Sequence, residues 1–172
     1  MELIEYLASP GTGKTTAAFL ELHLRKADRG IVEFIREVPQ EFFLAGRGNF
    51  GNGNQALYLG TYLRKVLDLK DMGYETVICD SSFMTNLLYP DNVFNGVLLG
   101  GMVDAVYEHL HKVGIGVTIN VLSRDKTRKH IQLGRRETEA ESDAIQESVI
   151  RRVEELRDTP AYRGVTFNFG GA

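Results

Sequence analysis

The sequence has little of what would place a protein outside the cell or in a membrane. Its single cysteine, Cys79, cannot form an internal disulfide, which favours a reducing, cytoplasmic setting. No apolar run approaches the roughly 18 residues of a membrane span. Glu2 and Glu5 interrupt the apolar stretch that a secretion signal would need near the N-terminus. We therefore expect a cytoplasmic protein with no membrane partner.

The sequence also lacks a strong excess of one charge and lacks low-complexity segments. Its net charge is −3, so nothing in the overall composition attracts nucleic acid or an anionic membrane. Hydrophobic residues make up 43% of the 172 residues and charged residues 25%, which is typical of a globular chain. Because no linker or internal repeat is visible, we expect one domain over residues 1–172 with a full core.

A phosphate-binding pattern stands near the N-terminus. The apolar run from Leu3 leads into SPGTGKTT, with Ala8 where the first glycine of a P-loop usually stands. Two glycines would let backbone N–H groups approach phosphate oxygens, and the helix that follows would turn its positive end toward them. A lysine adds charge, and the first threonine hydroxyl can coordinate Mg²⁺. The pattern predicts a nucleoside triphosphate site made of Ser9, Pro10, Gly11, Thr12, Gly13, Lys14, Thr15 and Thr16.

Strand-like and helix-like segments alternate along the chain, which predicts a parallel sheet with helices on both faces. The expected fold is an α/β, three-layer αβα P-loop domain with five parallel strands. We expect strands near residues 3–7, 31–34, 75–79, 115–122 and 165–169, and helices near 14–28, 55–72, 94–112 and 138–159. On the first helix we expect Ala17, Leu20 and Leu24 to be buried and Gly30 to be the C-cap.

Two acidic positions follow strands of this expected sheet. Asp80 closes a buried apolar strand, where an acid can orient Mg²⁺ through water, or where it can merely cap the next helix. Glu33 and Glu37 bracket Arg36 just after the second strand. Glu33 is the candidate catalytic base and Arg36 a candidate ligand of the substrate, while Glu37 reads more easily as a surface charge.

Two further segments are candidates for moving parts. Residues 44–54 are rich in glycine and asparagine, which suits either a flexible surface loop or a substrate-side flap, and Tyr58 next to them could stack on a base or belong to the core. Residues 123–137 are strongly basic and suit an arginine-rich lid, a groove for a polynucleotide or a solvated loop. We expect catalysis from Arg124 and Arg136 and substrate contacts from Arg128 and Arg135.

Together these motifs resemble small P-loop kinases of the thymidylate kinase and nicotinamide riboside kinase type, including phage nucleotide kinases. The similar segments cover most of the chain in order: SPGTGKTT at 9–16, EFIRE at 33–37, ICDSSFMTN at 78–86, LGRRETEAESDAI at 133–145 and TPAY at 159–162. The resemblance implies ATP and Mg²⁺ as cofactors, a base or metal orienter at Glu33, Asp80 beneath the phosphates, and lid arginines at Arg124, Arg135 or Arg136. It also implies the cytoplasm of a host cell if a phage encodes the chain.

The acceptor of the phosphate stays open at this point. Ser81 stands where thymidylate kinases usually carry an arginine that handles an acceptor phosphate. A nucleoside or a deoxynucleoside monophosphate is the first expectation. Modified DNA is the alternative, since kinases of 5-hydroxymethyluracil in phage DNA resemble thymidylate kinases. A P-loop ATPase switch without an acceptor is a third possibility, and a homodimer is compatible with all three.

Overall fold

The computed structural model describes residues 1–9, 11–36, 52–87, 96–123 and 138–171. Within these ranges the chain forms five β-strands, four α-helices and two short 3₁₀ helices. The strands are β1 (Glu2–Leu7), β2 (Val32–Ile35), β3 (Thr76–Cys79), β4 (Gly116–Ser123) and β5 (Val165–Gly171). The helices are α1 (Lys14–Ala27), α3 (Asn52–Asp71), α4 (Gly96–Lys112) and α5 (Glu139–Leu156), with the 3₁₀ helices η1 (Phe83–Leu87) and η3 (Pro160–Tyr162).

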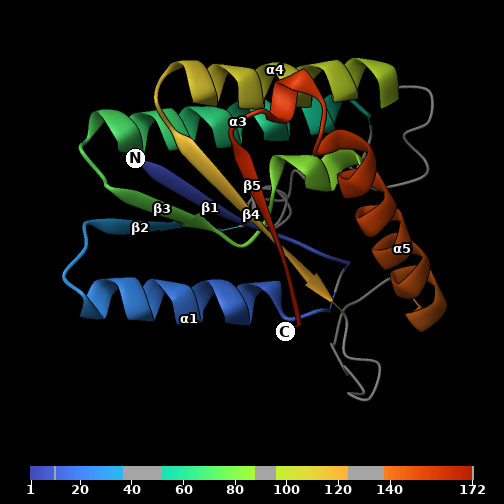
Figure 1. Cartoon of the computed structure of the whole chain (residues 1–172), viewed down its shortest axis with the longest axis horizontal. Helices are drawn as coiled ribbons and strands as arrows, with labels where there is room; N and C mark the ends of the chain where they lie inside the picture. The colour runs from blue at the N-terminus through green and yellow to red at the C-terminus, as the bar shows by residue number, and fades with distance from the viewer. Residues whose placement is uncertain (10, 37–51, 88–95, 124–137, 172) are drawn as a thin grey trace.

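All five strands are parallel and lie in the order β2-β3-β1-β4-β5. The α1 helix lies on one side of the sheet, and α3 and α4 lie on the other (Figure 1). The fold is therefore α/β with a five-stranded parallel sheet, and its layers are compatible with the expected αβα arrangement. Because every strand runs the same way, the carboxyl ends of the strands and the start of α1 share one edge of the sheet.

The larger part of the core lies on the α3 and α4 face of the sheet. Side chains from β1, β3 and β4 meet α3, α4 and α5 there, and Leu59, Val66, Leu110, Val149 and Val153 of these helices are buried. Strands of a parallel sheet that helices cover on both faces are nearly continuous apolar runs in the sequence. These runs are why the sequence predicts the strands of this core well.

The buried face of α1 differs from the expectation. Ala18 is fully buried and Ala17 and Leu22 pack against the sheet, whereas Leu20 is 59% exposed and Leu24 is 52% exposed. Among the described elements α1 alone packs on this face, so only a narrow stripe of the helix meets the strands. The prediction of Leu20 and Leu24 as buried positions was wrong because periodicity gives the spacing of a face but not its rotation.

The end of α1 also differs from the expectation. The left-handed residue is Arg29 with φ 62°, and its N–H donates to the carbonyl of Lys26 at 3.1 Å. The Gly30 N–H donates to the carbonyl of Arg25 at 3.2 Å, which completes a Schellman motif. A Cβ on Gly30 would lie 3.1 Å from Val32 and 3.2 Å from the Arg25 carbonyl. Gly30 is therefore required for close approach, one residue after the left-handed position.

Three other helix ends carry residues that are typical of such positions. Thr138 caps α5 in a capping box, with its hydroxyl accepting from the Glu141 N–H at 3.2 Å. Gly73 and Gly114 adopt positive φ where α3 and α4 end. The expected loop 44–54 lies outside the described residues except for its last three, and the expected lid 123–137 does so except for Ser123. Over the ranges that the structure describes, no helix combines the length and the apolar content needed to cross a bilayer.

Candidate functional site

Two glycines in the turn between β1 and α1 adopt a left-handed backbone conformation. Gly11 has φ 83° and Gly13 has φ 94°, a region that residues with a Cβ rarely adopt. A Cβ on Gly13 would meet no atom within 4 Å, so the backbone conformation rather than crowding requires this glycine. Gly13 is also the N-cap of α1 and supplies no capping side chain. The N–H groups of the first turn of α1 therefore point toward this turn, and the N-cap residue has no side chain that could accept a hydrogen bond from them.

Two buried hydroxyls brace this turn from within. The Ser9 and Thr12 hydroxyl oxygens lie 3.0 Å apart, and the Thr12 hydroxyl donates to the Ser9 carbonyl at 2.9 Å. Ser9 is fully buried and Thr12 is 3% exposed. These side chains shape the turn, so any ligand contact from them would come through the backbone.

An amide from α5 ties the turn to the end of β4. The Ser9 N–H donates to Oε1 of Gln146 at 3.0 Å, and Nε2 of Gln146 donates to the Leu122 carbonyl at 2.9 Å. Gln146 is 8% exposed and shares a buried helical face with Val149 and Val153. The sequence analysis did not single out Gln146, although its spacing of three from Val149 places it on the same helical face.

Lys14 brings its ammonium group to the same turn. Nζ donates to the carbonyl of Ala8 at 3.1 Å and to the carbonyl of Ser9 at 3.2 Å. The side chain is half-buried, and a compact cation with three donors in this place can bind phosphate oxygens as a point charge.

Thr15 and Asp80 meet across the carboxyl edge of the sheet. The Thr15 hydroxyl donates to Oδ2 of Asp80 at 3.2 Å, although the two residues lie 65 positions apart. Asp80 follows β3 directly and is 3% exposed. Mg²⁺ in phosphate sites usually binds through one or two protein oxygens and completes its shell with phosphates and water. The hydroxyl and carboxylate oxygens of this pair fit such an ion.

Glu33 does not lie where the sequence predicted it. It stands inside β2, aligned with Val77 of β3, because the strand runs on to Ile35. Its Oε1 accepts the Phe34 N–H at 2.9 Å and its Oε2 accepts the Tyr74 hydroxyl at 3.3 Å. Tyr74 precedes β3, so this carboxylate leans toward the amino end of the sheet. The expectation that Glu33 follows the strand was wrong, and its carboxylate covers a backbone donor of an edge strand.

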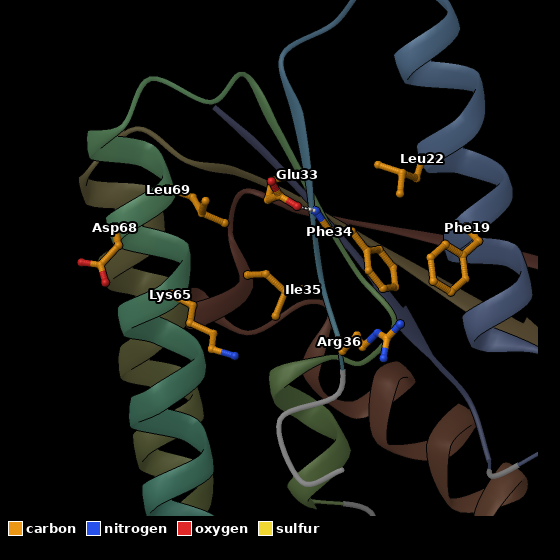
Figure 2. A pocket seen from close by; sticks show the side chains of 9 residues that line it. All are labelled: Phe19, Leu22, Glu33, Phe34, Ile35, Arg36, Lys65, Asp68 and Leu69. Atoms are coloured by element: carbon orange, nitrogen blue, oxygen red, sulfur yellow. Dashed lines mark hydrogen bonds between the residues drawn. The ribbon is translucent and has the colours of Figure 1, made fainter. Parts of the chain in front are cut away.

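A pocket of about 500 Å³ lies beside β2, between α1 and α3 (Figure 2). The Phe19 and Phe34 rings stack along one wall with centroids 4.5 Å apart, and Lys65 projects from α3 toward β2. Arg36 also lines the pocket. It follows the last residue of β2, Ile35, whose carbonyl accepts the Asp80 N–H at 3.4 Å, so Arg36 lies near the carboxyl edge of the sheet. Glu33 and Arg36 thus both line the pocket, and no described residue of the turn before α1 lines it.

The remaining predicted residues divide into two groups. Tyr58 is 2% exposed and belongs to the core, so its ring offers no free face for stacking, and Thr16 lies exposed in the first turn of α1. The other positions lie outside the described residues, and their roles stay predictions: Pro10, Glu37, Arg124, Arg128, Arg135 and Arg136.

A buried carboxylate that the sequence analysis did not single out as a functional residue lies beneath this edge. Glu5 of β1 is fully buried, and burial raises its pKa to about 7, against hydrogen bonds from Tyr107, Ser82, Tyr62 and the Phe83 N–H that lower it. A signal was available, since Glu5 stands between the inward positions Leu3 and Leu7 of a central strand. In a strand, residues two apart share a face.

The chain matches no protein-family model, and a search of curated proteins finds no match either. The carboxyl edge of the sheet thus combines three features. They are a turn with two left-handed glycines, the Lys14 ammonium group on that turn, and the Thr15 hydroxyl with the Asp80 carboxylate beside it.

Proposed function

We propose that this chain is an ATP-dependent phosphotransferase that moves the γ-phosphate of ATP to a nucleotide-like acceptor at the carboxyl edge of its sheet. One observation carries the proposal. The Thr15 hydroxyl and the Asp80 carboxylate lie 3.2 Å apart beside the turn that bears Lys14. A phosphate-binding turn, a threonine at its end and an acid on the neighbouring strand are the parts that position a metal-bound triphosphate.

Each of these residues has a chemical task in the proposed site. Lys14 and the N–H groups at the start of α1 bind phosphate oxygens, and Thr15 and Asp80 hold Mg²⁺. Mg²⁺ held by this pair would neutralise phosphate charge and help to orient the triphosphate. An acceptor oxygen forms the new bond to the γ-phosphorus as the bond to the bridging oxygen breaks. ADP leaves with that electron pair, and a proton from an acceptor hydroxyl passes to solvent.

Arg36 is the described cation that best suits the acceptor. It is exposed, follows β2 directly and stands next to the Asp80 strand end. Ser81 is 8% exposed, and its hydroxyl lies 3.1 Å from the Thr85 hydroxyl, so it braces its own turn. We propose that Arg36 supplies the acceptor contact that an arginine after Asp80 would otherwise make. Glu33 is not proposed as a base, because the Phe34 N–H and the Tyr74 hydroxyl donate to its carboxylate.

The proposal is tested by offering γ-labelled ATP and Mg²⁺ with a panel of acceptors. The panel holds nucleosides, deoxynucleoside monophosphates, nicotinamide riboside, DNA ends and DNA with hydroxymethylated bases. We expect label on one small acceptor or, for the alternative, on the modified DNA with a steep loss as salt is added. ATP hydrolysis with label on no acceptor would instead support a switch ATPase.

Two variants of one helix control this experiment. Lys14→Ala removes the ammonium from the turn and should lower transfer at least ~10²-fold, because a phosphate contact in the transition state is lost. Lys26→Ala removes an exposed ammonium near the far end of α1 and should leave transfer unchanged. Equal rates for the two variants would contradict the assignment of the turn as the phosphate site.

We also propose a cytoplasmic location, which the free thiol of Cys79 and the proposed use of ATP support. Cys79 is a free thiol that is 1% exposed at the end of β3, and the sequence holds no second cysteine to pair with it. The donor nucleotide that we propose is also abundant in that compartment.

A further inference from the structure

The buried polar cluster around Glu5 has no part in the site described so far. Four donors from three places in the fold converge on this carboxylate. Oε2 accepts the Tyr107 hydroxyl of α4 at 2.7 Å and the Ser82 hydroxyl at 2.8 Å. Oε1 accepts the Tyr62 hydroxyl of α3 at 2.9 Å and the Phe83 N–H at 3.4 Å. Both carboxylate oxygens are thus saturated by groups that are themselves buried.

Burying such a polar cluster at the centre of a sheet is unfavourable for the free energy of folding. Removing a carboxylate from water costs several kcal/mol even after relaxation, and an apolar side chain of similar size often serves stability better. Leu3 and Leu7 fill the neighbouring inward positions of the same strand without any polar group. A role in fixing geometry accounts for Glu5 better than a role in stability.

The geometry that Glu5 fixes is the turn immediately after Asp80. The Ser82 hydroxyl, which donates to Glu5, also accepts the Met84 N–H at 3.1 Å. The Tyr62 hydroxyl lies 3.4 Å from the Ser81 carbonyl as well as 2.9 Å from Glu5. The turn is therefore attached to β1 and α3 within two residues of Asp80.

Asp80 has little room to adjust independently of that turn. Its N–H donates to the Ile35 carbonyl on one side, and its Oδ2 accepts the Thr15 hydroxyl on the other. A rotation of the Ser81–Ser82 peptide would be transmitted to the Asp80 backbone and would change the direction of its carboxylate. Groups that hold a metal ligand in place typically matter about 10- to 100-fold in metal affinity.

We propose that Glu5 is a positioning residue for Asp80: through Ser82 and Phe83 it holds the turn after β3, so that the Asp80 carboxylate faces Thr15. Glu5 touches no ligand and acts only through this turn. The inference rests on the proposed function, because it concerns the orientation of Thr15 and Asp80, the two residues proposed to hold Mg²⁺.

The test measures the Mg²⁺ effect, defined as the affinity for ATP with Mg²⁺ divided by the affinity with a chelator, by calorimetry on the full chain. Glu5→Gln keeps the size of the side chain but places amide donors against the hydroxyls of the cluster. It should lower the Mg²⁺ effect about tenfold or more while the affinity in chelator changes less than about twofold. Ser82→Ala removes the link to the turn and should act in the same direction.

A matched pair of tyrosines separates positioning from loss of packing. Tyr107→Phe removes a hydroxyl that donates to Glu5, whereas Tyr162→Phe removes a buried hydroxyl from the ring that packs on Tyr107 with centroids 5.0 Å apart. Only Tyr107→Phe should lower the Mg²⁺ effect. Thermal unfolding monitored by circular dichroism identifies variants that do not fold, and if Glu5→Gln is one of them, Ser82→Ala and Tyr107→Phe decide.

The possible failures are distinguishable. If the wild-type chain binds no ATP, or binds it equally with and without Mg²⁺, the proposed function itself fails. If the wild-type chain shows the Mg²⁺ effect and folded Ser82→Ala and Tyr107→Phe keep it in full, Asp80 keeps its function and the positioning role of Glu5 is overturned.

Discussion

Two glutamates on strands of the same sheet have opposite surroundings. Glu33 lies on β2 at the edge of the sheet, where its carboxylate accepts a strand N–H and one tyrosine hydroxyl. Glu5 lies on the central strand β1, fully buried, where three hydroxyls and an N–H donate to it. An edge strand offers unpaired donors and water to a carboxylate, whereas a central strand offers neither, so an acid on it must be satisfied by donor groups from other parts of the chain.

The largest difference between the two carboxylates should appear in the pH dependence of stability. Burial raises the pKa of Glu5 to about 7 from 4.5, so its contribution to stability is complete below pH 4.5 and is lost as the pH rises through about 7. The loss amounts to about 3 kcal/mol in the free energy of unfolding. The groups facing Glu5 (Tyr62, Tyr107 and Cys79) stay neutral over this range, because burial raises their pKa values too.

Chemical denaturation between pH 4.5 and 8 measures this difference. The wild-type chain should lose stability with rising pH relative to Glu5→Gln, and Glu33→Gln should keep the wild-type slope. A wild-type slope equal to that of Glu5→Gln would mean that Glu5 is ionised throughout and would remove the contrast.

The second contrast concerns the tyrosines that donate to the two acids. Tyr107→Phe should destabilise the chain by about 1–3 kcal/mol, because it removes a 2.7 Å bond to a buried acid. Tyr74→Phe should cost at most about 0.5 kcal/mol, because its 3.3 Å bond reaches a half-buried carboxylate that water can also serve. Urea unfolding at pH 7 compares the two variants, and equal losses would contradict the distinction between edge and centre.

The smallest effect is expected for Glu33 in phosphate transfer. Glu33→Gln should leave the transfer rate within about threefold of wild type, since its carboxylate leans away from the carboxyl edge of the sheet, whereas a general base is worth about 10² or more. Steady-state rates with the acceptor found in the panel give the comparison. A fall of a hundredfold with ATP affinity kept would restore Glu33 as the base.

The same contrast explains what could be predicted from the sequence. The turn with Gly11 and Gly13, the strand just before Asp80 and the capping box at Thr138 depend on neighbours in the chain, so local patterns predict them. The five strands and their alternation with helices follow from periodicity in the same way. Their parallel arrangement then follows from the length of the connections.

What could not be predicted depends on rotation and on register between distant segments. Leu20 and Leu24 were expected inside because the rotation of α1 against the sheet is not encoded in spacing. Glu33 was placed after its strand because strand ends shift by a residue or more. The partners of Glu5 and Gln146 come from segments far apart in sequence, so no local pattern reveals them.

In the proposed function, Thr15 and Asp80 form one Mg²⁺ site beside a phosphate-binding turn. The most direct measurement is a double-mutant cycle on ATP affinity with Mg²⁺ and with a chelator, using Thr15→Ala, Asp80→Asn and the double variant. Each single variant should lower the Mg²⁺ effect about tenfold or more, and the double variant little further, because both residues serve one ion. Independent, additive losses from the two variants, or a wild-type chain whose ATP affinity ignores Mg²⁺, would contradict the claim.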